Sequence, residues 1–144
     1  MCGIVGFTGR QQAAPILLNG LSKLEYRGYD SAGIAVRDGE RLAQVVKAKG
    51  RLGNLIEKTD EGKALIGTCG IGHTRWATHG VPSNMNSHPH TNESETISIV
   101  HNGIIENYAS IKECLLEQGY KFQSQTDSEV IVHMLDYYYQ GDMM

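Results

Sequence analysis

Cys2 is the side chain in this sequence that is best suited to covalent chemistry. Removal of Met1, which is usual when the next side chain is small, would make Cys2 the first residue. Its thiol would then be the nucleophile, and its own α-amine, with an ordinary pKa of about 7.7–8.0, would be the general base. A lone cysteine at the start of a strand is more often a buried structural residue. The other polar motifs of the chain decide between these two interpretations.

Further along the chain, three motifs carry groups that can bind charge. In Asn102-Gly103 an amide NH2 stands next to a backbone N–H that no side chain obstructs. Such donors can stabilise an oxyanion, although the same dipeptide also favours a tight turn. Arg75 can hold a carboxylate through two parallel hydrogen bonds. Asp127 can pair with a cation, but an acidic residue in the first turn of a helix is favoured by the helix dipole alone.

Composition limits the class of protein. The chain has 144 residues, 40% hydrophobic content, and 13 Lys+Arg against 16 Asp+Glu, which gives a net charge of −3. We therefore expect one soluble domain that binds neither nucleic acid nor anionic membranes. The longest apolar runs are only a few residues, too short for a transmembrane helix. The three cysteines have no CxxC spacing, which favours free thiols in a reducing cytosol.

The hydrophobic spacing predicts an α+β chain with mainly antiparallel strands. We expect strands at residues 4–8, 33–37, 42–49, 64–76, 96–101 and 120–122. We expect helices at residues 13–24, 52–58, 107–118 and 126–139. Asp38-Gly39 is a two-residue hairpin signal, Gly119 a helix C-cap, and residues 126–129 a capping box. The loop at residues 77–93 is long enough to be a functional lid.

Five motifs occur in one order along the chain, and together they resemble the N-terminal glutaminase domain of class II glutamine amidotransferases. They are CGIVG at 2–6, YRGYDSAG at 26–33, HTRWATHG at 73–80, HNG at 101–103 and TDSE at 126–129. These enzymes are the branch of the N-terminal-nucleophile hydrolases that uses cysteine. The second and third motifs are most similar to members that aminate fructose 6-phosphate. The resemblance runs from residue 1 to about residue 141.

The resemblance implies a catalytic role for three of the residues. Cys2 would attack the side-chain amide of L-glutamine, release ammonia and leave a γ-glutamyl thioester, which water would hydrolyse. Asn102 and Gly103 would form the oxyanion hole for the tetrahedral intermediate.

The resemblance also implies which residues bind or support. Arg75 would hold the α-carboxylate of glutamine and Asp127 its α-ammonium group. Further contacts with glutamine are implied for Trp76, Thr78 and His79, which follow Arg75 in the same loop. This loop would be a lid that closes over glutamine, with Gly80 as its hinge. A supporting role without a chemical step is implied for Arg27 and Gly28. We interpret the remaining histidines and cysteines as structural: His88 and His90 by hydrogen bonds, and His73, His101, His133, Cys69 and Cys114 by packing.

The implied fold is the four-layer αββα sandwich of N-terminal-nucleophile hydrolases, incomplete at its C-terminus because no strand follows the last helix. Residues 1–144 would be a partial glutaminase domain. The sugar-phosphate isomerase domain that receives the ammonia in full-length members, which we expect to be cytoplasmic homo-oligomers, would be absent. No metal is expected, because His88-Pro89-His90 has no further ligand at a usual spacing. No organic cofactor is implied.

Two alternatives stay open. One is another class II amidotransferase, such as amidophosphoribosyltransferase or asparagine synthetase, against which the HTRWATHG segment argues. The other is a non-catalytic module that binds glutamine. Retention of Met1 would favour the second, because the amine of Cys2 would then be tied up in a peptide bond.

Overall fold

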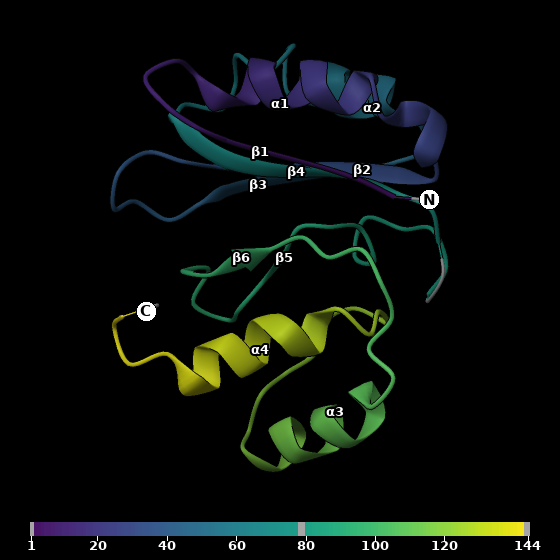
Figure 1. The fold of residues 1–144 in the computed structure, drawn as a ribbon, viewed down its shortest axis with the longest axis vertical. Coiled ribbons are helices and arrows are strands. Elements are labelled where there is room, and N and C mark those ends of the chain that lie inside the picture. The colour runs from purple at the N-terminus through teal and green to yellow at the C-terminus, as the bar shows by residue number, and fades with distance from the viewer. Residues whose placement is uncertain (1, 78–79, 143–144) are drawn as a thin grey trace.

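The computed structural model describes residues 2–77 and 80–142, and these form four layers (Figure 1). The outer helical layer contains α1 (Ala13–Ser22) and α2 (Leu52–Lys58). Beneath it lies a four-stranded sheet of β1 (Gly3–Thr8), β2 (Ser31–Arg37), β3 (Gln44–Lys49) and β4 (Cys69–Arg75). A two-stranded sheet follows, made of β5 (His90–Thr91) and β6 (Ser98–Ile99). The far side is covered by α4 (Glu129–Tyr138) and then α3 (Tyr108–Glu117).

The strand order brings two distant parts of the chain to one edge of the larger sheet. The order is β1-β4-β2-β3, and every neighbouring pair is antiparallel. Gly3 at the start of β1 pairs with Thr74, one residue before Arg75 at the end of β4. Cys2 therefore lies next to Trp76 because of the register of the sheet.

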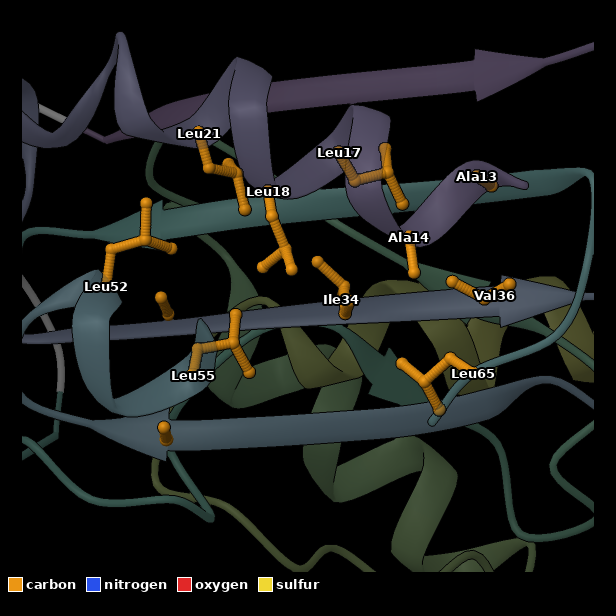
Figure 2. Close-up of a cluster of buried hydrophobic side chains, with 12 residues drawn as sticks. Ala13, Ala14, Leu17, Leu18, Leu21, Ile34, Val36, Leu52, Leu55 and Leu65 are labelled. Carbon is orange, nitrogen blue, oxygen red and sulfur yellow. The ribbon is translucent and has the colours of Figure 1, made fainter. Parts of the chain in front are cut away.

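The apolar core lies between the outer helices and the larger sheet (Figure 2). Leu17 and Leu21 of α1 and Leu55 of α2 are fully buried, as are Ile34 and Val36 of β2. The i, i+4 spacing places the two α1 leucines on one face of the helix. Each such side chain contributes about 1.5–3 kcal/mol when buried. This core holds in place the sheet that carries the site.

The two sheets come very close together at Gly33 of β2. A Cβ on Gly33 would lie 2.1 Å from the carbonyl oxygen of His88, which belongs to the segment leading into β5. No larger residue fits there without a shift of the backbone. Strand β2 is accordingly buried on both faces, which agrees with the lack of alternation between polar and apolar residues in its sequence.

Several predicted elements are confirmed. Helix α2 has the predicted limits, and β1, α1 and α3 agree to within two residues at each end. Gly119, at φ +92°, ends α3 as expected. Its N–H donates to the Leu116 carbonyl while the Tyr120 N–H donates to that of Leu115, which is the hydrogen-bond pattern of a Schellman motif.

Other predicted elements are wrong in extent. The strand predicted at 64–76 begins only at Cys69, because the backbone of Gly67 is bonded to Gln12 and Ala13 at the start of α1. The strand predicted at 96–101 shrinks to β6, and residues 120–122 form none. Strands β2 and β3 are joined by residues 38–43 with a turn from Asp38 to Arg41, so the two-residue hairpin is also wrong.

The predicted capping box at 126–129 does not form. The Glu129 carboxylate instead accepts hydrogen bonds from the backbone N–H groups of Gln123 and Ser124, at 2.8 and 2.7 Å. The Thr126 hydroxyl contacts His90 Nε2 at 2.8 Å. Helix α4 therefore begins later than predicted, after Ser128, without a side-chain cap.

The packing role assigned to two cysteines is wrong as well. Cys69 and Cys114 are both exposed free thiols rather than core residues. Cys69 opens β4 at the far end of the sheet from Cys2, since it pairs with Thr8 at the end of β1.

Candidate active site

A cavity of about 620 Å³ opens at the sheet edge where Cys2 lies. Among the residues singled out in the sequence, it is lined by Cys2, Arg27, Arg75, Trp76, Asn102, Gly103 and Asp127. Further polar groups in its wall come from His73, His88, His101, Thr126 and Ser128. Thr78 and His79 lie outside the described residues, as does Met1, on which the prediction of a free N-terminal amine depends. Residues separated by about a hundred positions thus share one cavity.

The Cys2 sulfur is held by the end of β4. The backbone N–H of Trp76 donates to Sγ at 3.2 Å, and Sγ lies 3.5 Å from the Trp76 carbonyl oxygen. The side-chain NH2 of Asn102 donates to the carbonyl of Cys2 at 3.1 Å. Cys2 is only partly buried. The thiol therefore has a fixed position and faces a space that a substrate could enter.

Asn102 and Gly103 line the same cavity and belong to the stretch that follows β6. Asn102 Oδ1 lies 2.7 Å from His73 Nε2, and its NH2 points toward Cys2. Gly103 has φ +147°, and a Cβ there would lie 3.0 Å from His101 Nε2. The backbone angle therefore favours glycine, and any larger residue would also press on the His101 ring.

Arg75 is buried at the end of β4, and its guanidinium is oriented by its neighbours. Nη1 lies 3.8 Å from Asp30 Oδ1, and Nη2 donates to the carbonyl of Gly80 at 3.1 Å. Asp30 also accepts hydrogen bonds from the Ser31 hydroxyl, at 2.9 Å, and from the backbone N–H of Ala77. Asp30 therefore ties Arg75 to the loop that follows it. This fixed guanidinium lines the cavity, where it could meet a carboxylate.

Asp127 is also buried in the cavity wall, two residues before α4. Its Oδ2 accepts a hydrogen bond from the backbone N–H of Ile105 at 2.7 Å. A carboxylate held in this way supplies negative charge on the side of the cavity formed by α4. Arg75 and Asp127 give the cavity one buried group of each sign, and the partly buried Arg27 also lines it.

The residues predicted to support the nucleophile lie beneath and beside Arg75. A Cβ on Gly28 would lie 2.8 Å from the backbone carbonyl of Arg75, so the loop before β2 packs directly on β4. Arg27 ends the short 3-10 helix Glu25–Arg27 and lines the cavity. The indole of Trp76 is half exposed and meets the Tyr29 ring edge-on at 5.2 Å. The structure brings all of these residues to the same site.

Three buried imidazoles stack behind the oxyanion-hole candidates. His73 and His88 lie face to face at 4.2 Å, and His88 meets His90 at 4.5 Å. Burial lowers the pKa of His73 to about 4 and that of His90 to about 3, and it lowers the pKa of His88 further still. Nearby positive charge from Arg75 acts in the same direction on all three. These imidazoles are therefore neutral at pH 7.

Within residues 2–77 and 80–142, no group of three or more His, Cys, Asp or Glu side chains is arranged to hold a metal ion. The same part of the chain has no helix long and apolar enough to cross a membrane.

The fold and the site define a class of protein. The family model for the glutamine amidotransferase domain matches residues 57–142, more than half of the chain. This chain belongs to that family. The sequence-based assignment to glutamine amidotransferases is therefore confirmed.

The chain is similar in sequence to one kind of amidotransferase from several bacteria. It is 62% identical over 144 residues to glutamine–fructose-6-phosphate aminotransferase (isomerizing) of Clostridium tetani, and 55% identical to the same enzyme of a Thermus thermophilus strain. The whole chain aligns in both cases, but it covers only 23% and 24% of these two relatives.

Solved structures confirm the fold. The chain superimposes over its full length on glutamine phosphoribosylpyrophosphate amidotransferase of Bacillus subtilis, with a TM-score of 0.80 and 28% identity. It covers 30% of that protein. The predicted αββα class of fold is thus confirmed, and it is shared by amidotransferases with different acceptors.

Sequence reasoning missed two residues that organise the site. Asp30 appeared only as part of a motif, and His73 was interpreted as a packing residue. The structure bonds these residues to Arg75 and to Asn102 respectively. The available signal was that each lies two residues from a predicted site residue, Gly28 and Arg75 respectively, but recognising the contacts would have required the strand pairing.

Proposed function

We propose that this chain hydrolyses the side-chain amide of L-glutamine to glutamate and ammonia, with Cys2 as the nucleophile. One observation carries the proposal: Cys2, Asn102 and Gly103 line a single cavity together with one buried cation, Arg75, and one buried anion, Asp127. Free glutamine presents an amide, a carboxylate and an ammonium group, so these residues match its three functional groups.

In the first step, with Met1 removed, the α-amine of Cys2 takes the thiol proton and Sγ bonds to the amide carbon. The carbonyl electron pair moves onto oxygen. Asn102 uses one N–H on the Cys2 carbonyl, and its NH2 group has a second to donate. That N–H and the Gly103 N–H would meet the oxyanion, and each donor stabilises such a transition state by about 2.7–4 kcal/mol.

The intermediate then collapses. The electron pair on oxygen re-forms the carbonyl, the C–N bond breaks, and the nitrogen takes the proton from the α-ammonium group of Cys2 and leaves as ammonia. Water attacks the resulting thioester by the same route, with the amine as base again. Glutamate leaves and the thiol is restored.

Recognition of glutamine falls to the charged residues. Arg75 would bind the α-carboxylate, and Asp127 would bind the α-ammonium group. The proposal retains Thr78 and His79 as further contacts from the same loop, and Arg27 and Gly28 as supports. Trp76 would cover the bound substrate, with Gly80, at φ +77°, as the hinge.

The test is glutamate release by the purified chain. We expect hydrolysis of glutamine, none by C2A, and a raised KM for R75K, because lysine cannot form two parallel hydrogen bonds to a carboxylate. Binding of glutamine without release of glutamate by a chain that lacks Met1 would contradict the proposal and identify a non-catalytic glutamine-binding module.

We further propose that residues 1–144 correspond to a glutaminase domain whose ammonia, in a longer cytoplasmic protein, aminates fructose 6-phosphate at a sugar-phosphate isomerase domain. Identity of 52–62% to the fructose-6-phosphate enzymes, against 28% to the phosphoribosylpyrophosphate amidotransferase of known structure, supports this acceptor. We expect the longer protein to be a homo-oligomer. The isolated chain should make no glucosamine 6-phosphate from glutamine and fructose 6-phosphate, and detection of that product would contradict the proposal.

A further inference from the structure

We propose that His73 is a positioning residue for Asn102: its Nε2–H donates to Asn102 Oδ1 and so holds the amide NH2 toward Cys2 and the reacting carbonyl. This inference rests on the proposed function, because it concerns the oxyanion donor of that reaction. It gives His73 a role beyond the packing that we expected from its position in a buried strand.

The contacts of Asn102 fix which way its amide faces. Oδ1 lies 2.7 Å from His73 Nε2, and Nδ2 lies 3.1 Å from the carbonyl oxygen of Cys2. If the amide were turned over, Oδ1 would face the Cys2 oxygen, and two acceptors would be in contact. The orientation that donates to Cys2 therefore requires a donor on the His73 side.

The surroundings of His73 supply that donor in one tautomer. Oδ1 of Asn102 can only accept, so Nε2 of His73 carries the hydrogen. Nδ1 is buried and has no hydrogen-bond partner among the described residues. A second proton would place a buried charge beside the Arg75 cation. Burial lowers the pKa of His73 to about 4 and outweighs the raising effect of the hydrogen bonds with Asn102 and with the backbone of His101. The ring thus stays neutral, with its one N–H aimed at Asn102.

The ring of His73 has little freedom to move. It is 1% exposed, stacks on the His88 ring at 4.2 Å, and belongs to the central strand β4. Asn102, by contrast, follows β6 in a stretch without regular structure. The rigid strand therefore positions a donor that sits on a loop.

A matched pair of variants tests the inference. Gln and Met are similar in length and volume, but only Gln can donate an N–H to Asn102 Oδ1. We expect H73M to lower kcat for glutamine hydrolysis roughly 10- to 100-fold with KM changed by less than about threefold, below the 10²–10³-fold cost of deleting a donor outright. The kcat of H73Q should be at least tenfold higher than that of H73M.

Two further readouts separate positioning from general damage. Alkylation of Cys2 by iodoacetamide forms no oxyanion, so its rate should stay within about twofold of wild type in both variants. In an N102A background, H73M and H73Q should have equal kcat, because the group that His73 positions is gone. Urea midpoints check that each variant folds. If H73M fails to fold, H73Q carries the test alone, with a kcat within tenfold of wild type supporting the inference.

The outcomes are distinct. Folded H73M and H73Q that lose kcat equally, or an H73M with wild-type kcat, would overturn the role of His73 while leaving the glutaminase intact. A kcat more than a hundredfold down in folded H73Q would also overturn it. A wild-type chain without Met1 that releases no glutamate would remove the proposed function itself.

Discussion

The backbone N–H of Trp76 donates to the sulfur of Cys2 at 3.2 Å, so the nucleophile is held by the residue that directly follows the candidate carboxylate-binding Arg75. The pairing of Gly3 with Thr74 sets this relationship. The proposed nucleophile and the proposed carboxylate-binding group are thus positioned by one antiparallel strand pair, and a shift in that pair would disturb both.

Replacing Gly3 should therefore affect catalysis and stability together. A Cβ there would lie 2.8 Å from Leu24 Cβ and 2.8 Å from Thr74 Oγ1. We expect G3A to lose about 1–3 kcal/mol of stability through overpacking and at least tenfold in glutaminase kcat. Gly6, on the same strand, is the matched control, because nothing lies within 4 Å of its Cβ position. Urea unfolding and glutamate release measure the two effects, and G3A indistinguishable from G6A would contradict this view.

Asp30 should matter for stability because it compensates the buried charge of Arg75. Removing one partner of a buried ion pair costs about 3–5 kcal/mol. Since Asp30 is 17% exposed and Asn keeps one oxygen, we expect D30N at the lower end, about 3 kcal/mol. D38N is the control, because the Asp38–Arg41 pair spans 4.0 Å at the exposed surface; its effect should stay within about 0.5 kcal/mol. Equal urea midpoints for the two variants would refute the compensating role.

The contact between the two sheets at Gly33 predicts a strong effect of one methyl group. In G33A the new Cβ would meet the His88 carbonyl oxygen, so the sheets must separate or the backbone must shift. We expect a loss of about 3 kcal/mol or more. G53A within α2, where nothing lies within 4 Å, should instead gain about 0.5–1 kcal/mol. The order of thermal midpoints, G53A above wild type above G33A, checks this, and any other order contradicts it.

The buried imidazoles predict acid sensitivity. His73 and His90 have folded pKa values of about 4 and 3, below the ordinary 6.5, and the pKa of His88 is lowered as well. In this case the unfolded chain takes up protons first, so stability is lost as the pH falls below about 6.5. With more than one imidazole contributing, the free energy of unfolding should fall by more than about 1.4 kcal/mol per pH unit between pH 6 and 5.

A second acid-linked loss should begin below about pH 4.5. Burial would raise the pKa of Glu129, but the nearby His133 side chain and the hydrogen bonds from Gln123 and Ser124 outweigh it and lower the pKa to about 2. Urea unfolding from pH 7.5 down to the limit of folding measures both losses. H90Q should reduce the slope between pH 6 and 5, whereas a flat profile in the wild type would show that the imidazoles are not buried.

The sequence pattern was sufficient to predict those helices and helix ends that depend only on neighbouring residues. Helix α2 and the glycine end of α3 depend on spacing and backbone angle within a few residues, and both were predicted with their limits. Residues 64–68 were predicted as the first part of a strand that runs to residue 76. The backbone groups of Gly67 are instead used by Gln12 and Ala13, more than 50 positions earlier, and no local pattern contains that information.

Some residues of the site could likewise be predicted from the sequence, and others only from the structure. Motif order indicated Cys2, Arg75, Asn102 and Asp127, and the structure brings all four to one cavity. His73 and Asp30 escaped because a histidine or an aspartate in a buried strand or turn is most often structural. Their importance comes from contacts with residues distant in the sequence, 2.7 Å from His73 to Asn102 and 3.8 Å from Asp30 to Arg75.

The most direct test of Cys2 as an N-terminal nucleophile is the intact mass of the purified chain before and after exposure to a diazoketone analogue of glutamine. We predict a starting mass that lacks methionine, followed by one adduct that maps to Cys2 and is blocked by excess glutamine. A chain that lacks Met1 and takes no adduct, or one that keeps Met1 and still hydrolyses glutamine, would contradict this mechanism.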